Sequence, residues 1–166
     1  MRIKRIAQTL VIIPEVKKIL LGLHKAGNFK GSYTGFLDYA DENESMVDAA
    51  WRISRQQCGI ELIDLELRAI LTFTADDFGI AHEYEFYTSA WKGTPKETET
   101  IRPVWFEFDN IPYKKMPADD EFWYPSFLEG KLQKGRFHFA PGMQDLIEHE
   151  LSEVNVIDPE GMLSKH

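Results

Sequence analysis

The sequence is poor in the features that define several large classes of protein. It has one cysteine, Cys58, among 166 residues, which excludes an internal disulfide framework and a zinc site built from several cysteines. No apolar run approaches the ~20 residues that a membrane-spanning helix needs. Positive charge is also in deficit, because 19 Lys+Arg stand against 27 Asp+Glu, for a net charge of -8. This balance argues against binding duplex nucleic acid through its phosphates, although a single nucleotide needs only a few local groups.

Signals for export and for several common catalytic sites are missing as well. The apolar run at residues 9–13 follows basic residues, as in a signal peptide, but Pro14 ends it and no small-residue cleavage site follows. There is no phosphate-binding loop, no G-x-G-x-x-G fingerprint and no G-x-S-x-G motif. The five histidines show no metal-ligand spacing. We therefore expect a single domain over residues 1–166, a cytoplasmic location, no membrane partner, and a thiol at Cys58 that serves packing.

One segment carries a well-marked helix signal. Ser45 can cap a helix over residues 45–57, with Asp48 three residues on and Gly59 just past the end. We expect Trp51 to be at least partly buried within this helix. The stripe expected to face the core consists of Val47, Ala50, Trp51 and Ser54.

Most of the remaining chain has the apolar and β-branched character of strands. The predicted strands are residues 9–13, 17–23, 62–74, 83–91, 104–108 and 135–139. Residues 120–128 predict a short helix despite Pro125, and residues 143–154 fit a helix or a strand equally well. The predicted fold class is therefore α/β or α+β, with mixed strands around one clear helix.

Two acidic stretches are candidate functional sites. Carboxylates before the predicted helix could bind a hard cation, or could simply form a solvated loop that favours the helix dipole. The pair Asp119-Asp120 is followed by aromatic residues and could accept hydrogen bonds from the edge of a base, or could cap a helix. The carboxylates of the first stretch are Asp38, Asp41, Glu42, Glu44 and Asp48.

The segment 35–62 resembles the Nudix box in length and skeleton. It reads GFLDYADENESMVDAAWRISRQQCGIEL, and it keeps the family's positions at Glu44, Arg52, Gly59 and Ile60. From about residue 9 to residue 154 the chain is similar to one branch of that family, the MutT homologues that hydrolyse oxidised purine nucleoside triphosphates. The resemblance implies an α/β/α sandwich around a mixed β-sheet, and it implies that residues 143–154 end in a strand.

The resemblance also implies where the family's chemistry would lie, and here the chain departs from the pattern. Where the family has glutamates that hold Mg²⁺ or Mn²⁺, this chain has Ile53, Gln56 and Gln57. These positions are i, i+3 and i+4, so they share a helix face, yet they offer no negative charge. We therefore expect no metal at this face. Glu44 is expected to pair with Arg52 rather than to form a metal site by itself.

The base pocket that the resemblance implies is better kept. Its two adjacent aspartates, which read the purine edge, match Asp119 and Asp120. Three positions depart from the family: Thr34 replaces an asparagine, His24 replaces a lysine and Pro117 replaces a stacking tryptophan. The remaining matches are the aromatic walls Phe73, Trp123 and Phe139 and a threonine of the pocket floor, Thr9.

Three hypotheses about function follow. In the first, the chain is a Nudix-fold protein that binds a small-molecule nucleotide with little or no hydrolysis. In the second, it is an active nucleoside triphosphate pyrophosphohydrolase whose Mg²⁺ or Mn²⁺ is displaced onto the acidic loop. In the third, it is a non-catalytic interaction protein whose pocket is filled by its own side chains, with a protein partner that the sequence does not identify. The ligands of the displaced site would be Asp38, Asp41, Glu42 and Glu44.

Overall fold

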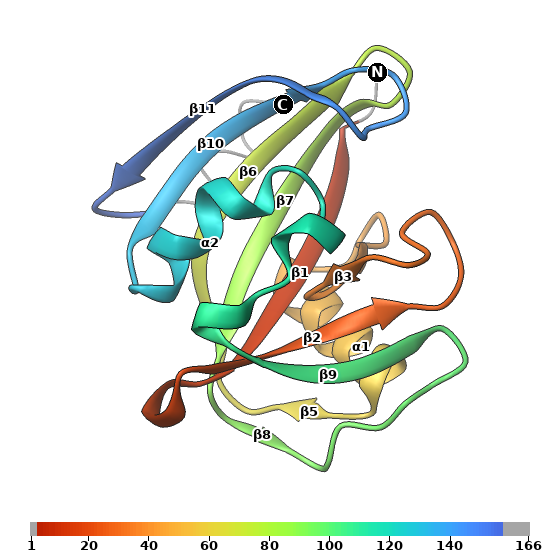
Figure 1. Cartoon of the computed structure of the whole chain (residues 1–166), viewed down its shortest axis with the longest axis vertical. Helices are drawn as coiled ribbons and strands as arrows, with labels where there is room; N and C mark the ends of the chain where they lie inside the picture. Colours follow the sequence, from red (N-terminus) through yellow and green to blue (C-terminus); the bar gives the residue numbers. More distant parts are fainter. Residues whose placement is uncertain (1–2, 158–166) are drawn as a thin grey trace.

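The computed structural model describes residues 3–157, which form a large mixed β-sheet (Figure 1). Along the sheet the strands follow the order β11-β10-β6-β7-β1-β2-β3, while β4 pairs with β1 and β9 with β2. Two pairings are parallel, β1 with β7 and β6 with β10, and the other pairings in this sheet are antiparallel. The strands are β1 (Lys4–Ile13), β2 (Lys18–His24), β3 (Tyr33–Thr34), β4 (Phe36–Tyr39), β6 (Glu66–Ala75), β7 (Gly79–Thr88), β9 (Ile101–Glu107), β10 (Leu132–Phe139) and β11 (Leu146–Val154).

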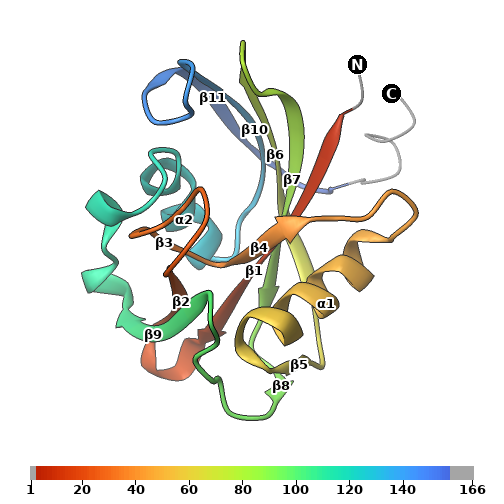
Figure 2. The ribbon, with the colours of Figure 1, turned by 90° about the vertical axis from the view of Figure 1, so that its right-hand side faces the viewer.

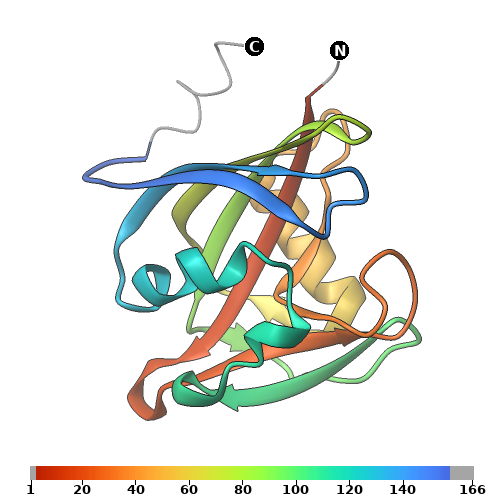
Figure 3. The same cartoon turned by 45° about the horizontal axis from the view of Figure 1, so that its top comes forward.

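Two α-helices cover opposite faces of this sheet. Helix α1 (Met46–Cys58) lies on one face and α2 (Asp120–Leu128) on the other, as Figures 2 and 3 show. This arrangement confirms the expected α/β/α sandwich around a mixed sheet. Among the described residues, no helix is long and apolar enough to cross a membrane.

Side-chain alternation along β1 divides the core into two parts. Ala7 and Val11 belong to a cluster that includes residues of α1, which we call the α1-side core. Leu10 and Ile12 belong to a cluster that includes residues of α2, the α2-side core. Because successive side chains of a strand point to opposite faces, one strand supplies both halves.

The ends of α1 match the sequence prediction, whereas its buried stripe does not. The Ser45 hydroxyl accepts a hydrogen bond from the Asp48 backbone N–H at 3.0 Å, and Gly59 ends the helix with φ 76°. Ala50 and Ser54 are buried as expected, and Trp51, at 37% exposed, is partly buried as expected, whereas Val47 is 51% exposed and does not belong to the buried stripe. The stripe is rotated because small and polar residues weaken its apolar signal. It consists of Met46, Ala49, Ala50, Ile53, Ser54 and Cys58.

Several predicted strands need correction in their bounds. The predicted strand at residues 62–74 is interrupted, because β5 (Glu61–Leu62) ends before β6 begins and pairs with β8 (Trp91–Lys92) in a small separate sheet. The ambiguous residues 143–154 contain a strand, β11, as the resemblance implied. Asp38, which was expected in a loop, lies in β4. Three 3-10 helices complete the described chain: η1 (Pro14–Val16), η2 (Phe108–Asn110) and η3 (Tyr113–Lys115).

Candidate functional site

The helix face expected to replace the family's metal site is not an open face. Ile53 has no exposed surface and packs in the α1-side core. Gln57 is half-buried, and its Nε2 donates to the Leu37 carbonyl oxygen at 2.8 Å. Gln56 is exposed and accepts a hydrogen bond from Arg52 Nη1 at 3.1 Å. The three positions therefore have three different environments, and a carboxylate at position 53 would lie among apolar side chains.

Glu44 is held by Arg52, as the sequence predicted. Arg52 Nε and Nη2 donate to the two carboxylate oxygens at 2.8 and 2.9 Å, a bidentate ion pair. Glu44 also accepts from the Asp41 backbone N–H at 3.0 Å, and Arg52 Nη2 donates to the Tyr39 carbonyl at 3.0 Å. The hydrogen bond from Arg52 is the main reason that the pKa of Glu44 falls to about 2. Both carboxylate oxygens are thus already paired with donors.

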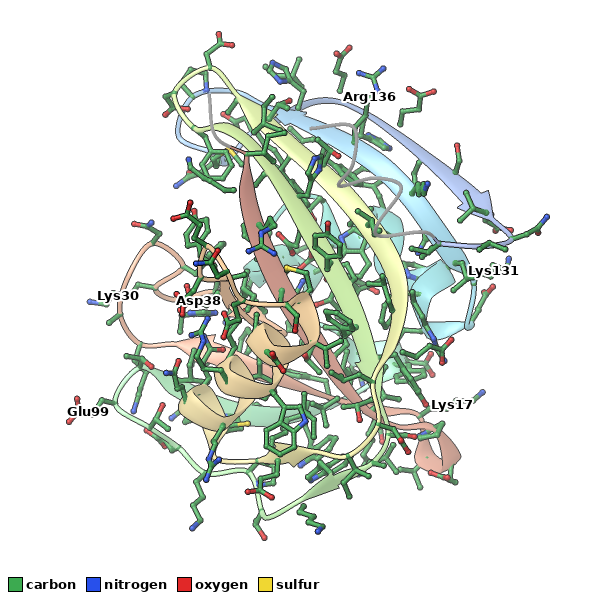
Figure 4. The ribbon with its side chains drawn as sticks, turned by 180° about the vertical axis from the view of Figure 1, so that it is seen from behind. Lys17, Lys30, Asp38, Glu99, Lys131 and Arg136 are labelled. Carbon is green, nitrogen blue, oxygen red and sulfur yellow. The ribbon has the colours of Figure 1, made fainter. Side chains whose placement is uncertain are left out.

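The acidic loop before α1 is organised around a guanidinium group. Arg5 Nη2 donates to the carbonyl oxygens of Asp41 and Glu42 at 2.7 and 3.1 Å, and Nη1 donates to that of Glu44 at 3.0 Å. Asp38, labelled on the α1 side in Figure 4, accepts from the backbone N–H of the next residue at 2.8 Å. A positive charge thus already lies against the backbone of the loop whose carboxylates a displaced cation would need. Within residues 3–157, no group of three His, Cys, Asp or Glu is arranged to hold a metal ion. The residues present do not fit the cation that the second hypothesis requires.

Asp119 and Asp120 lie at the start of α2, where their side chains are buried rather than capping. Asp119 occupies the N-cap position, but its side chain makes no capping hydrogen bond. Its Oδ2 instead accepts from Trp123 Nε1 at 2.9 Å, inside the protein. The Oδ2 atom of Asp120 is buried without a hydrogen-bond partner in the described residues. The capping interpretation is therefore wrong for Asp119.

A second pair of buried carboxyl groups, which the sequence analysis missed, comes from β7. A single amide, Gln8 Nε2 on β1, donates to Glu83 Oε1 at 2.9 Å and to Glu85 Oε2 at 2.7 Å. Gln8 is itself oriented by the Gly35 backbone N–H, which donates to its Oε1 at 2.8 Å. The alternation of Glu83, Tyr84 and Glu85 is typical of a strand with one solvated face, so local pattern gave no sign that the acids are buried.

The two pairs form one electrostatic unit, which we call the carboxyl cluster: Glu83, Glu85, Asp119 and Asp120. Burial raises the pKa of all four groups, that of Glu83 to about 7 and those of Glu85 and Asp120 well above their ordinary values. Neighbouring negative charge raises the pKa further, as Asp119 and Glu83 do for Asp120. Within the part of the chain that the structure describes, no basic side chain contributes to these shifts. A raised pKa favours the protonated carboxyl group, which can donate as well as accept a hydrogen bond.

The other predicted pocket residues divide between the two sides of the sheet. Phe73, Trp123 and Phe139 belong to the α2-side core, with the Phe73 and Phe139 ring centroids 6.2 Å apart. Thr9 does not join them, because alternation along β1 places it opposite Gln8, and its partner Phe36 belongs to the α1-side core.

The two substituted positions Thr34 and His24 contact each other. The Thr34 hydroxyl donates to the Gly35 carbonyl at 2.6 Å and lies 2.7 Å from His24 Nε2. Because the hydroxyl has one hydrogen, the imidazole is the donor in the second contact. Burial lowers the pKa of His24, so this histidine is neutral and its replacement of the family's lysine removes a charge.

Comparison of sequences identifies curated relatives of this chain, among them the following two proteins. The chain is 31% identical over 147 residues to an oxidized purine nucleoside triphosphate hydrolase of Danio rerio, covering 88% of this chain and 94% of the relative. It is 30% identical over 148 residues to the protein of the same name from Mus musculus, covering 89% and 94%. No family model matches the chain.

Comparisons of structure identify similar folds at lower sequence identity. A MutT protein from Bacillus halodurans aligns with a TM-score of 0.78 at 21% identity, covering 90% of this chain and 98% of that protein. A MutT NUDIX hydrolase from Burkholderia pseudomallei aligns with a TM-score of 0.62 at 18% identity, covering 68% and 88%. At these identities the likeness concerns the fold.

Proposed function

This chain belongs to the MutT-like Nudix family, and on that premise we propose that it binds a purine nucleotide but has lost the family's metal-dependent hydrolysis. The observation that carries the proposal is the environment of two residues, Ile53 in α1 and Glu44 in the loop before it. Ile53 is part of the core, and Glu44 is bound by Arg52, so neither offers a free carboxylate to a cation.

Hydrolysis of a nucleoside triphosphate depends on such carboxylates. Mg²⁺ is usually bound through one or two protein carboxylates together with substrate phosphates. The metal neutralises developing charge and helps to generate the attacking hydroxide, so its loss should lower the rate by many powers of ten. Gln56 and Gln57 supply only neutral amides, and Gln57 already donates to the Leu37 carbonyl.

Nucleotide binding is supported by the opposite face of the sheet, where α2 lies. Asp119 and Asp120 stand where the resemblance places the residues that read a purine edge, and their side chains lie inside the protein beside Trp123. Because these side chains are almost covered, a ligand reaches them only in a more open conformation of the protein. The cost of that opening lowers the apparent affinity.

Turnover measurements test the first part of the proposal. Oxidised and ordinary purine nucleoside triphosphates are incubated with the protein in the presence of Mg²⁺ or Mn²⁺, and pyrophosphate and monophosphate are quantified. We expect no hydrolysis above background. Turnover at an ordinary enzymatic rate, roughly 1 per second or faster, would refute the proposal.

Thermal-shift and calorimetric binding measurements test the second part. Nucleoside mono-, di- and triphosphates are added with and without metal, and a nucleotide that binds the native state must raise the melting temperature. Asp120→Asn should then weaken binding by roughly 1–3 kcal/mol, the cost of leaving a buried hydrogen-bonding group without its partner. Exposed Glu121 on the same helix provides the matched control, Glu121→Gln. If no nucleotide changes the melting temperature, the interaction-protein hypothesis replaces this one.

A cytoplasmic location is part of the same proposal. It is supported by the chain's single cysteine, Cys58, which is a buried free thiol.

A further inference from the structure

The carboxyl cluster contains more acid than the recognition of one base edge requires. Asp119 and Asp120 alone supply four oxygens, and Glu83 and Glu85 approach them from β7. Glu83 and Glu85 point to the α2 side of the sheet with Gln8, because Tyr84 between them belongs to the α1-side core, and the two aspartates begin α2 on that same side. Burying so many carboxyl groups without a basic partner is costly, and such groups are expected to have a purpose when their oxygens remain unpaired.

Several polar atoms in and beside the cluster are buried without a hydrogen-bond partner among residues 3–157. They are Glu85 Oε1 and Asp120 Oδ2, together with the hydroxyl of Tyr124 on the same face of α2. Tyr124 has no exposed surface, and all four carboxyl groups act on its hydroxyl. Ring contacts with Tyr113 of η3, at 6.0 Å between centroids, cover this side of the cluster. Two of the three unpaired atoms are carboxyl oxygens, which can accept hydrogen bonds from the N–H groups of a ligand.

We propose, resting on the proposed function, that Glu83 extends the base site and selects a base edge rich in N–H donors that carries positive charge. The geometry around Gln8 supports this role. Its amide is fixed by Gly35 and holds both glutamates, so the Glu83 carboxylate is pre-positioned rather than free to turn away. Pre-positioned acceptors lose little entropy when a ligand arrives.

Exposure distinguishes the two glutamates. Glu83 is 8% exposed, Asp119 4% and Asp120 3%, whereas Glu85 has no exposed surface. Glu83 is therefore the least covered of the four carboxyl groups, and Glu85 is the most deeply buried. Glu83 is the specificity-determining residue in this arrangement, and Glu85 and Gln8 position it. A cationic ligand is favoured because it replaces the protons that otherwise neutralise these groups.

Two pairs of nucleotides test the contributions of the amino group and of the positive charge separately. Guanosine monophosphate differs from inosine monophosphate by one amino group, and 7-methylguanosine monophosphate differs from guanosine monophosphate by a positive charge. Calorimetry should show that the wild-type protein binds the first member of each pair about tenfold more tightly, the effect of one well-placed hydrogen bond to a charged group. In Glu83→Gln the charge preference should fall to within about twofold and the amino preference should shrink, while Glu121→Gln keeps both. A purely structural role for Glu83 would weaken all nucleotides equally and leave both ratios unchanged.

A probe without phosphate separates this inference from the proposed function. 2-Aminobenzimidazole is a flat bicyclic cation near neutral pH, and benzimidazole is its less basic counterpart without the amino group. If nucleotides fail to bind but the cationic probe binds wild type and not Glu83→Gln, the proposed function is wrong and the acid site stands. If nucleotides bind with the same preferences in wild type and Glu83→Gln, the inference is overturned and the proposed function stands. If neither nucleotides nor the probe bind, both are overturned.

Discussion

The pH dependence of stability offers a direct test of the carboxyl cluster. Burial, reinforced by the charge of Asp119, raises the pKa of Glu83 from 4.5 to about 7. The native protein therefore binds this proton more tightly than the unfolded chain does. The resulting stabilisation is fully present below pH 4.5 and is lost as the pH rises through 7. At 1.36 kcal/mol per pKa unit the loss is roughly 3 kcal/mol, most of it between pH 5 and pH 8.

The substitution Glu83→Gln isolates this effect. Glutamine has the shape of a protonated glutamic acid, and its carbonyl oxygen can still accept from Gln8 while its amide donates to Glu85. The variant should match wild type near pH 5 and exceed its unfolding free energy by roughly 3 kcal/mol at pH 8. For a chain of this length the difference in melting temperature is about 5–10 °C. Because the two glutamates titrate as a pair, Glu85→Gln should change stability in the same direction.

Thermal and urea unfolding at pH 5, 6, 7 and 8, followed by tryptophan fluorescence, measure the difference. His24 has a pKa lowered by burial, so its contribution is present above 6.5 and is lost as the pH falls. Wild type and Glu83→Gln share this histidine, so its effect cancels in the difference. Glu121→Gln should give a curve parallel to wild type. A difference between Glu83→Gln and wild type that stays constant from pH 5 to pH 8 would refute the reasoning.

The other predictions concern α1 and the core. Ile53→Glu should destabilise the protein by at least 3 kcal/mol in urea unfolding, because it buries an unpaired charge, whereas Gln56→Glu on the exposed side should change stability by no more than about 0.5 kcal/mol. Arg52→Ala should cost roughly 1–3 kcal/mol because it leaves the Glu44 carboxylate without its partner, and an unchanged midpoint would argue against the ion pair. Trp51→Ala should lower the unfolding free energy by only about 1 kcal/mol, whereas Trp123→Ala, which empties a fully buried position, should lower it by roughly 3–5 kcal/mol. Equal losses of stability would contradict the partial exposure of Trp51.

The features that sequence determined are those decided by neighbouring residues. Ser45 caps the start of α1 through its hydroxyl, and Gly59 ends the helix with a positive φ. Both residues act through hydrogen bonds that span three or four residues, so the helix bounds could be predicted. The Glu44–Arg52 pair spans eight residues and followed from the family pattern. Residues 120–128 formed the predicted helix although Pro125 lies inside it.

Only the tertiary structure decided which polar groups lose their water. Gln8 and Glu83 are 75 residues apart in sequence, and they meet because β1 and β7 pair in parallel. The alternation around Glu83 fits a solvated strand face, and it is the packing of α2 that covers that face. Arg5 likewise contacts the acidic loop from more than 30 residues away. Capping and periodicity are local and can be read along the chain, whereas desolvation depends on elements brought together by folding, and desolvation sets the charge of this site.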